Sequence, residues 1–292
     1  DLEKGIVRAV GDPEERMRED RLRALRALRF AARFEFEIDA STWDAIVGSA
    51  PHLGRLSAER VKQEIEKTVN QVRKPSRAFA MWRTSGAFAT LIPELAEVTP
   101  LELATIDSLC LPVAKGRPDR SMMRLIALFA AAPPGAVPGL LKGLRFSNAD
   151  AAWIGSIVSH WNDLEKEMRF AMTDETPSDP ILRRWAAIAG RTRLASVLRL
   201  ASARWAAERH AGIAAPPPAR VASVYRRSIR IAYNDAIEVG DLAINGRDLE
   251  KLGINEPDVG QTLRWILEMV INDPTLNSRD KLLEKVNLRS VE

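Results

Sequence analysis

Acids and arginines near the N-terminus form the part of this sequence best suited to chemistry. Five side chains could act together there: Arg16, Glu19, Asp20, Arg23 and Arg26. On a helix, Arg16, Asp20 and Arg23 are spaced four and three residues apart and share one face. A carboxylate beside a guanidinium presents a hydrogen-bond acceptor next to donors. Cytosine and adenine offer the complementary pattern, whereas uracil and guanine offer the reverse order.

The same spacing also fits a surface helix without a ligand. Glu–Arg pairs on a helix each contribute roughly a few tenths of a kcal/mol to its stability. The pattern alone therefore leaves two interpretations open, a base-recognition site and a solvated helix with internal ion pairs.

A run of arginines in the C-terminal half is a second candidate for function. The 292 residues carry 43 Lys+Arg and 39 Asp+Glu, a net charge of +4, but residues 181–230 contain 11 Arg, no Lys and one acid, Glu208. Such a density of guanidinium groups suits a phosphate backbone, although a solvated basic helix face would look the same. We predict RNA contacts from six of these residues: Arg183, Arg184, Arg191, Arg193, Arg199 and Arg204.

The composition excludes several classes of protein. The single cysteine, Cys110, cannot form an intramolecular disulfide, and we expect it to be buried and inert in a reducing compartment. No apolar run is long enough to cross a bilayer and no signal peptide is visible, so we expect a cytoplasmic protein without a membrane partner. We also expect no metal site and no catalytic residue in this chain, because it has three histidines and no Asp-x-Asp pair.

Hydrophobic periodicity predicts an almost all-α protein that positions these residues on helices. The pattern from Met17 to Phe34 predicts long helical material, while residues 5–10 favour an edge strand that has nothing to pair with. Helix starts are predicted at Asp12, at Asp39 to Thr42 and at Ser57, and a helix containing Cys110 is predicted between Thr99-Pro100 and Gly116. Interruptions are predicted at 174–180 and at the proline-rich connector 214–218.

Four segments in the same order resemble the class II tRNA nucleotidyltransferase/poly(A) polymerase family, which includes the CCA-adding enzymes. They are GDP at 11–13 with EDRLRALRALRFAARF at 19–34, LSAERVKQEI at 56–65, LRFSN at 144–148, and INGRDL at 244–249 with LGI at 252–254 and Gly260. Each segment alone is a weak signal. Together they make the resemblance specific over nearly the whole chain.

The resemblance implies a nucleotide site on the first segment. Asp20 and Arg23 would hydrogen-bond the base of an incoming CTP or ATP, and Glu19 would hold Arg23 in orientation. Arg16 and Arg26 would reach the triphosphate or brace the pocket.

The second segment would support that site. Glu59 and Arg60 would steady the base-reading helix, although plain helix N-cap packing explains the same residues. The family usually has proline after the template aspartate, whereas this chain has Arg21. We therefore expect Asp20 to sit within a continuous helix instead of capping one.

The resemblance also implies an elongated all-α arrangement of neck, body and tail. Residues 1–11 would be a remnant of a head strand, 12–73 the neck with base selection and RNA binding, 74–170 a helical body that could be a degenerate HD type, and 171–292 a tRNA-binding tail. In this family the Mg²⁺-binding carboxylates lie in a preceding head domain, so we expect this chain alone to be inactive.

The implied function is that of a CCA-adding tRNA nucleotidyltransferase, with tRNA, ATP and CTP as partners. Two alternatives stay open: a poly(A) polymerase of the same family, and a non-catalytic helical RNA-binding module. The sequence also leaves open the oligomeric state and the division of CC and A addition.

Overall fold

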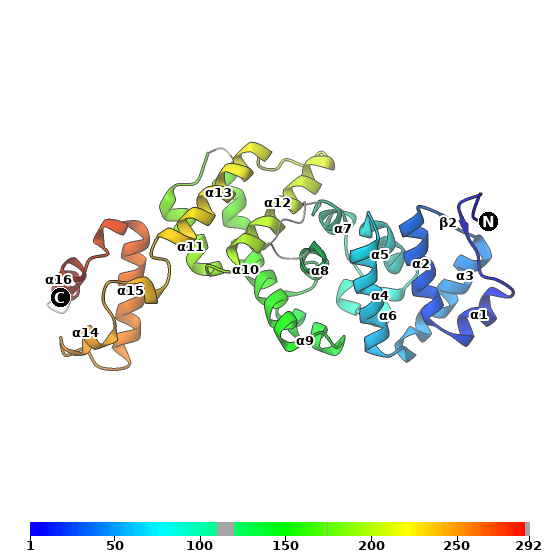
Figure 1. Cartoon of the computed structure of the whole chain (residues 1–292), viewed down its shortest axis with the longest axis horizontal. Coiled ribbons are helices and arrows are strands. Elements are labelled where there is room, and N and C mark those ends of the chain that lie inside the picture. Colours follow the sequence, from blue (N-terminus) through cyan, green and yellow to red (C-terminus); the bar gives the residue numbers. More distant parts are fainter. Residues whose placement is uncertain (110–119, 174, 290–292) are drawn as a thin grey trace. The chain divides into compact units, whose positions relative to one another are not determined.

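The protein is a set of α-helices with one small sheet (Figure 1). A computed structural model describes residues 1–109, 120–173 and 175–289, so Cys110 lies outside the described residues. Within those ranges, two short strands form the only sheet, and no helix is both long enough and apolar enough to cross a membrane. The predicted all-α fold class is confirmed.

The chain divides into two compact units. The first contains residues 1–163 and 199–215, and the second contains 164–198 and 216–292. Helices α10 and α12 contribute residues to both units. The neck, body and tail ranges come from the family resemblance and do not coincide with these two units. They stay predictions.

The elements up to α10 are β1 (Ile6–Val7), α1 (Pro13–Glu19), α2 (Leu22–Phe34), β2 (Glu37–Ile38), α3 (Ala40–Ser49), η1 (Ala50–Arg55), α4 (Ala58–Gln71), α5 (Pro75–Thr84), α6 (Ala87–Leu91), η2 (Pro93–Leu95), α7 (Pro100–Asp107), α8 (Arg120–Phe129), η3 (Pro134–Ala136), α9 (Val137–Gly143) and α10 (Asn148–Thr173). The remaining elements are α11 (Asp179–Ala189), α12 (Leu194–His210), α13 (Pro218–Asn234), η4 (Val239–Asp241), α14 (Gly246–Glu250), α15 (Asp258–Asn272), η5 (Pro274–Leu276) and α16 (Arg279–Arg289).

The sheet corrects one expectation. Strand β1 pairs in parallel with β2, with Ile6 opposite Glu37 and Val7 opposite Ile38. Parallel strands need a long crossover, and α1 and α2 supply it here. The prediction that the first strand had no partner was wrong, because a two-residue strand is too short to leave an alternating pattern in the sequence.

The predicted helix starts at Asp12, Asp39 and Ser57 are confirmed, and the helix predicted after Thr99 begins there but ends at Asp107, while Cys110 lies outside the described residues. Each side chain accepts a hydrogen bond from a backbone N–H in the first turn, that of residue 15 for Asp12, residue 42 for Asp39, residue 60 for Ser57 and residue 102 for Thr99. Such caps satisfy the free N–H groups of a helix start and each contribute about 1 kcal/mol. The start of α4 is thereby fixed at Ser57, three residues before Arg60.

The core of the first unit forms around α2, which packs on α4 and α5 (Figure 1). Leu25 and Leu28 on α2 are fully buried, as are Ile65 on α4 and Trp82 on α5. Burying each such side chain contributes about 1.5–3 kcal/mol. This packing fixes the rotation of α2 and so determines which of its arginines lie outside the core.

The second unit has its own core, in which α11 packs on α13 and α15. Trp185 is buried on α11 and donates its indole N–H to Glu167, 3.1 Å away. A separate cluster joins the last helices through Leu249, Ile266 and Leu282. The arginine-rich helices are therefore elements of a packed unit with apolar contacts on their inner sides.

Candidate functional site

Asp20 lies at a break between two helices. Helix α1 ends at Glu19 and α2 begins at Leu22, and Asp20 between them is extended, with φ −147° and ψ 103°. Its Oδ1 accepts the backbone N–H of Leu22 at 3.1 Å. The expectation of a continuous helix was wrong, because the Asp20 side chain caps the first N–H of α2 without the usual proline.

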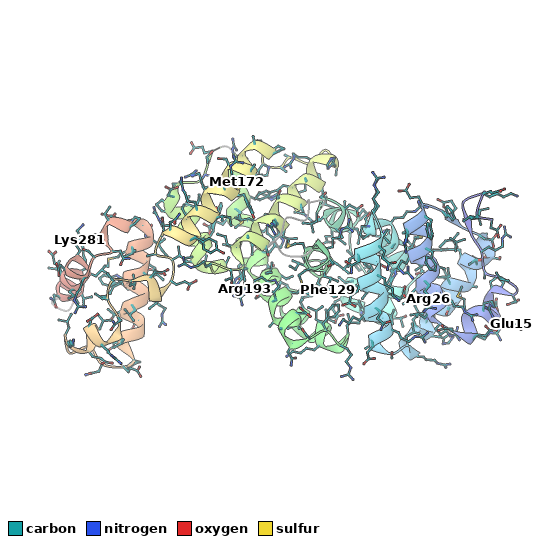
Figure 2. The ribbon with its side chains drawn as sticks, in the orientation of Figure 1. Glu15, Arg26, Phe129, Met172, Arg193 and Lys281 are labelled. Carbon is teal, nitrogen blue, oxygen red and sulfur yellow. The ribbon has the colours of Figure 1, made fainter. Side chains whose placement is uncertain are left out.

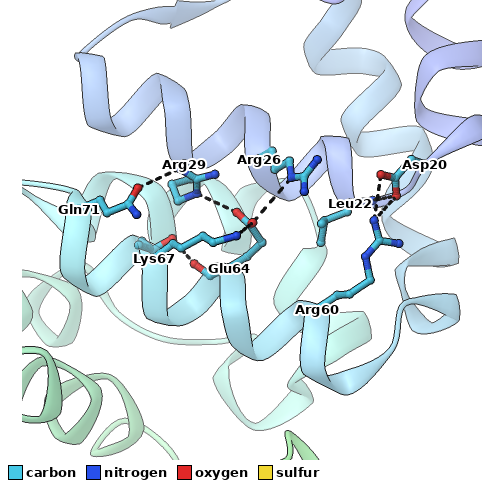
Figure 3. Close-up of polar contacts among 9 residues, drawn as sticks. Asp20, Leu22, Arg26, Arg29, Arg60, Glu64, Lys67 and Gln71 are labelled. Atoms are coloured by element: carbon cyan, nitrogen blue, oxygen red, sulfur yellow. Dashed lines mark hydrogen bonds and ion pairs between the residues drawn. The ribbon is translucent and has the colours of Figure 1, made fainter.

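The Asp20 carboxylate is held by a second helix. Nη2 of Arg60, on α4, lies 2.9 Å from both carboxylate oxygens (Figure 3). Partial burial raises the pKa of Asp20, but the Leu22 N–H and the Arg60 guanidinium together lower it by more, so this pKa lies below its ordinary value. At neutral pH the side chain is therefore an ionised, acceptor-only group.

Glu19 joins two arginines of the predicted site. Its Oε2 accepts hydrogen bonds from Nη1 of Arg16 at 2.5 Å and from Nη1 of Arg23 at 2.6 Å. Arg23 also donates to the backbone carbonyl of Arg16, 3.1 Å away. The contact expected between Glu19 and Arg23 is present, and two acceptors fix the direction of the Arg23 guanidinium.

Glu64 is a residue that the sequence reasoning missed. Its side chain on α4 is fully buried, and its oxygens lie 2.8 Å from Nε of Arg29, 3.8 Å from Nε of Arg26 and 3.4 Å from Nζ of Lys67 (Figure 3). A charge this deeply buried needs paired cations. Glu64 lies four residues after Arg60, so both side chains are on the same face of α4. This spacing was the signal in the sequence that could have placed Glu64 near the site.

Glu59 does not contact the Asp20 group. Its carboxylate is exposed and lies 3.5 Å from Nε of Arg145, in the LRFSN segment. The neighbouring Lys62 donates to the Arg145 carbonyl at 3.4 Å. Of the two residues, Arg60 contacts Asp20, whereas Glu59 connects α4 to the segment that follows α9, and their expected supporting role stays a prediction.

A hollow of about 250 Å³ is lined by both cationic and apolar side chains, and Asp20 and Arg60 are not among them. The cations are Arg8, Arg16, Arg23 and Arg26, and Met17 and Phe30 supply part of the apolar wall. Arg26 also lies close enough to Asp20 to help lower the pKa of that carboxyl. The hollow thus combines donors for anionic groups with a surface on which a flat ring can rest.

The arginine run has a different geometry from the one we predicted. Arg183 is buried, and its guanidinium donates to Asp235 at 2.6 Å and to the Ile271 carbonyl at 3.1 Å. Arg199 is also buried. The prediction of RNA contacts by these two side chains is corrected, because a buried guanidinium cannot meet a phosphate on the surface.

The other predicted arginines are less deeply placed. Arg191 donates to Asp241 at 2.6 Å and to the Ala232 carbonyl at 2.5 Å, and Arg204 donates to Glu208 at 3.1 Å. Arg184 is exposed. Arg193, whose side chain is labelled in Figure 2, is half-buried. RNA contact by these four residues stays a prediction.

The described residues do not fit a magnesium site. Nowhere in 1–109, 120–173 or 175–289 do three or more His, Cys, Asp or Glu side chains gather in a way that could hold a metal ion.

The sequence matches known proteins in two ways. A family model described as "Probable RNA and SrmB- binding site of polymerase A" matches residues 35–99. The CCA-adding enzyme of Pediococcus pentosaceus is 28% identical over 298 residues, which cover 98% of this chain and 65% of that enzyme. The chain therefore spans just under two thirds of the length of this relative.

Solved structures of CCA-adding enzymes are also similar to this chain. The Bacillus stearothermophilus CCA-adding enzyme in complex with CTP is 26% identical, with a TM-score of 0.70 over 99% of this chain and 67% of that one. The Thermotoga maritima CCA-adding enzyme complexed with tRNA is 19% identical, with a TM-score of 0.58 over 100% of this chain and 66% of that one, a likeness of fold. Over nearly its whole length the chain is similar in sequence and in fold to CCA-adding enzymes.

Proposed function

We propose that this chain selects the base of an incoming CTP or ATP and binds tRNA during CCA addition. The similarity to CCA-adding enzymes supports nucleotidyl transfer, and solved structures of such enzymes contain CTP or tRNA. The observation that carries the proposal is the placement of Asp20 and Arg23 three residues apart across a helix break, each held by a further charged side chain.

Base selection follows from the donors and acceptors of this pair. The ionised Asp20 carboxylate accepts the exocyclic amino group of cytosine or adenine, and Arg23 donates to the adjacent ring nitrogen. Uracil and guanine would place a carbonyl against the carboxylate and a ring N–H against the guanidinium. Because both side chains are already oriented, little order has to be gained when the base binds.

The surrounding charges have separate tasks in this proposal. Arg16 and Arg26 line the hollow and either bind the phosphates or support its wall. Glu64 on α4 holds the Arg26 side chain through an ion pair of 3.8 Å. Phe30 offers a ring surface in the same hollow. Phosphoryl transfer itself is assigned to the metal-binding head domain that the family resemblance implies, and this chain supplies recognition.

Direct titration of nucleotides tests the proposal. CTP and ATP should bind residues 1–292 more tightly than UTP and GTP, by about 5- to 150-fold if one bidentate contact contributes 1–3 kcal/mol. Arg23→Gln should reduce this preference. Arg18→Gln is the matched control, because Arg18 lies on α1 with only a 3.7 Å pair to Glu14. Equal affinity for all four nucleotides would contradict base selection.

A poly(A) polymerase is the second candidate, favoured by the family model matched at residues 35–99. A poly(A) polymerase would have to bind ATP more tightly than CTP. Competition between the two nucleotides separates the candidates: comparable affinities support CCA addition, and exclusive ATP binding supports polyadenylation.

A further inference from the structure

We propose that Arg21 is a positioning residue for base selection, because its guanidinium ties the helix break at Asp20 to a buried hydroxyl at the end of α3. The inference rests on the proposed function, in which Asp20 and Arg23 recognise the base. Two observations support it: the hydrogen bonds that the backbone of the break makes within α2, and the contact of the Arg21 side chain with α3.

The backbone of the break sets the positions of both base-recognition residues. Oδ1 of Asp20 accepts the Leu22 N–H at 3.1 Å (Figure 3), and the Asp20 carbonyl accepts the Arg23 N–H at 3.0 Å. The Arg21 carbonyl accepts the Ala24 N–H at 3.2 Å. The first turn of α2 is therefore built on the peptide groups of Asp20 and Arg21, and a rotation of either peptide would move the Asp20 carboxylate relative to Arg23.

Arg21 has no ring that would fix its backbone. Its φ of −56° lies in the range that a proline ring imposes, and its side chain makes no capping hydrogen bond to α2. An arginine can also adopt other backbone conformations. The conformation seen at the break therefore depends on what the Arg21 side chain contacts outside α2.

The Arg21 side chain reaches a different helix. Its Nη1 donates to Oγ of Ser49, which is 3.2 Å away and 28 residues further along the chain. Ser49 is the last residue of α3 and is only 1% exposed. A buried hydroxyl needs a hydrogen-bond partner, and a guanidinium is a strong one because it is always charged. Loss of either side chain would thus release the break from α3.

The end of α3 also attracts a cation. The carbonyl groups at the C-terminus of a helix carry a partial negative charge. Helix α3 has no basic residue of its own in its last turn. Arg21 supplies this cation from the neighbouring break, so both a hydrogen bond and the helix dipole favour the contact.

Helix α3 is bound to the chain on both sides of α1. It packs against α1 (Figure 1), and near its start Oγ1 of the buried Thr42 accepts the N–H of Ala9, which precedes α1, at 3.0 Å. Arg21 makes the corresponding contact after α1. Because α3 is attached before and after α1, it limits how far Asp20 can move when a base binds.

The ratio of CTP affinity to UTP affinity, measured on the full chain, tests this role. In Arg21→Ala and in Ser49→Ala the ratio should fall by about 2- to 30-fold, which is typical of substitutions that act on a site without touching its ligand. The double variant should fall no further than either single variant, because both remove the same contact. A loss of stability alone would weaken CTP and UTP binding alike and leave the ratio unchanged.

Arg83→Ala is the matched control. Arg83 is also half-buried in the first unit, and its Nη1 donates to the Val98 carbonyl at 3.0 Å. This variant removes one charge and one hydrogen bond but leaves the break intact, so the ratio should stay that of the unchanged protein. An equal fall in Arg83→Ala would overturn the proposal. A ratio that falls in Arg21→Ala but not in Ser49→Ala would overturn it as well.

Amide hydrogen exchange separates this inference from the proposed function. The Leu22 and Arg23 amides should exchange about 2- to 10-fold faster in Arg21→Ala and in Ser49→Ala, and at an unchanged rate in Arg83→Ala. If exchange becomes faster while the unchanged protein binds CTP and UTP equally, Arg21 holds the break and the proposed function fails.

Two other results would contradict the positioning role alone. If the unchanged protein prefers CTP and neither the ratio nor the exchange responds to Arg21→Ala, Arg21 does not hold the break. If exchange becomes faster but the ratio stays the same, Arg21 stabilises the break without affecting base selection, and the proposal is overturned.

Discussion

The two arginine-rich regions of this protein use their charges differently. Around Asp20, the ion pairs of α1 and α2 lie three or four residues apart or reach across to one neighbouring helix, α4. In the second unit, Arg183 and Arg191 bind acids that are 52 and 50 residues away. The denser run is thus largely engaged in holding its own fold.

This difference shows that charge density in a sequence does not by itself locate an interface. A guanidinium that finds an acid on a distant helix is removed from the surface, and the sequence gives no sign of it. Arg16 and Arg23 line a hollow because their shared partner, Glu19, is close in sequence and leaves part of each guanidinium exposed.

The largest expected effect on stability concerns the buried ion pair between Glu64 on α4 and Arg29 on α2. Glu64→Gln leaves the Arg29 charge buried without a carboxylate, so the free energy of unfolding should fall by about 3–5 kcal/mol in urea denaturation. The double variant Glu64→Met with Arg29→Met removes both charges, so the free energy of unfolding should fall by much less than in the single variant. A loss below about 1 kcal/mol in the single variant would show that this pair is not the anchor of α2 on α4.

A somewhat smaller loss of stability is expected when Arg183, which holds Asp235 and the Ile271 carbonyl in the second unit, is replaced. Arg183→Met should lower the free energy of unfolding by about 2 kcal/mol, because Asp235 and the Ile271 carbonyl lose their donor. Arg184→Gln, one residue on and exposed, should change it by less than about 0.5 kcal/mol. If Arg183→Met instead weakened RNA binding without loss of stability, its assignment as a brace would be wrong.

The smallest expected effect is the pH dependence of the Asp20–Arg60 pair. The pKa of folded Asp20 is lowered, so its contribution to stability is present above the unfolded pKa and is lost as pH falls through the folded pKa. Arg60→Gln should therefore cost less than about 1 kcal/mol at pH 7, and less again near pH 3. In an Asp20→Asn background this pH dependence should vanish, and its persistence would assign it to another group.

Much of the fold could be predicted because its signals are local. The caps at Asp12 and Ser57 and the helical periodicity need only a few neighbouring residues. The helix break at Asp20 was not predicted, because Arg21 stands where a proline would have marked it and the Asp20 side chain accepts the Leu22 N–H instead. The pairing of β1 with β2 was missed as well, since it depends on a crossover of about 30 residues.

The site was predicted in part for the same reason. Glu19 with Arg23 follows from helical spacing, whereas Glu64 with Arg29 depends on how two helices pack. Long-range partners likewise moved Arg183 out of the predicted RNA-binding set. Helical spacing indicated the pair whose members lie one turn apart, whereas the contact of Arg60 with Asp20 was indicated only by the resemblance and that of Glu64 with Arg29 was missed.

The most direct test of the central claim is the affinity of Asp20→Ala for CTP and for UTP, measured side by side with the unchanged protein by calorimetric titration. Loss of the carboxylate acceptor should weaken CTP binding by about 5- to 150-fold and leave UTP binding nearly unchanged, so that the ratio of the two affinities approaches one. A CTP to UTP ratio that stays as high as in the unchanged protein would contradict base selection at Asp20.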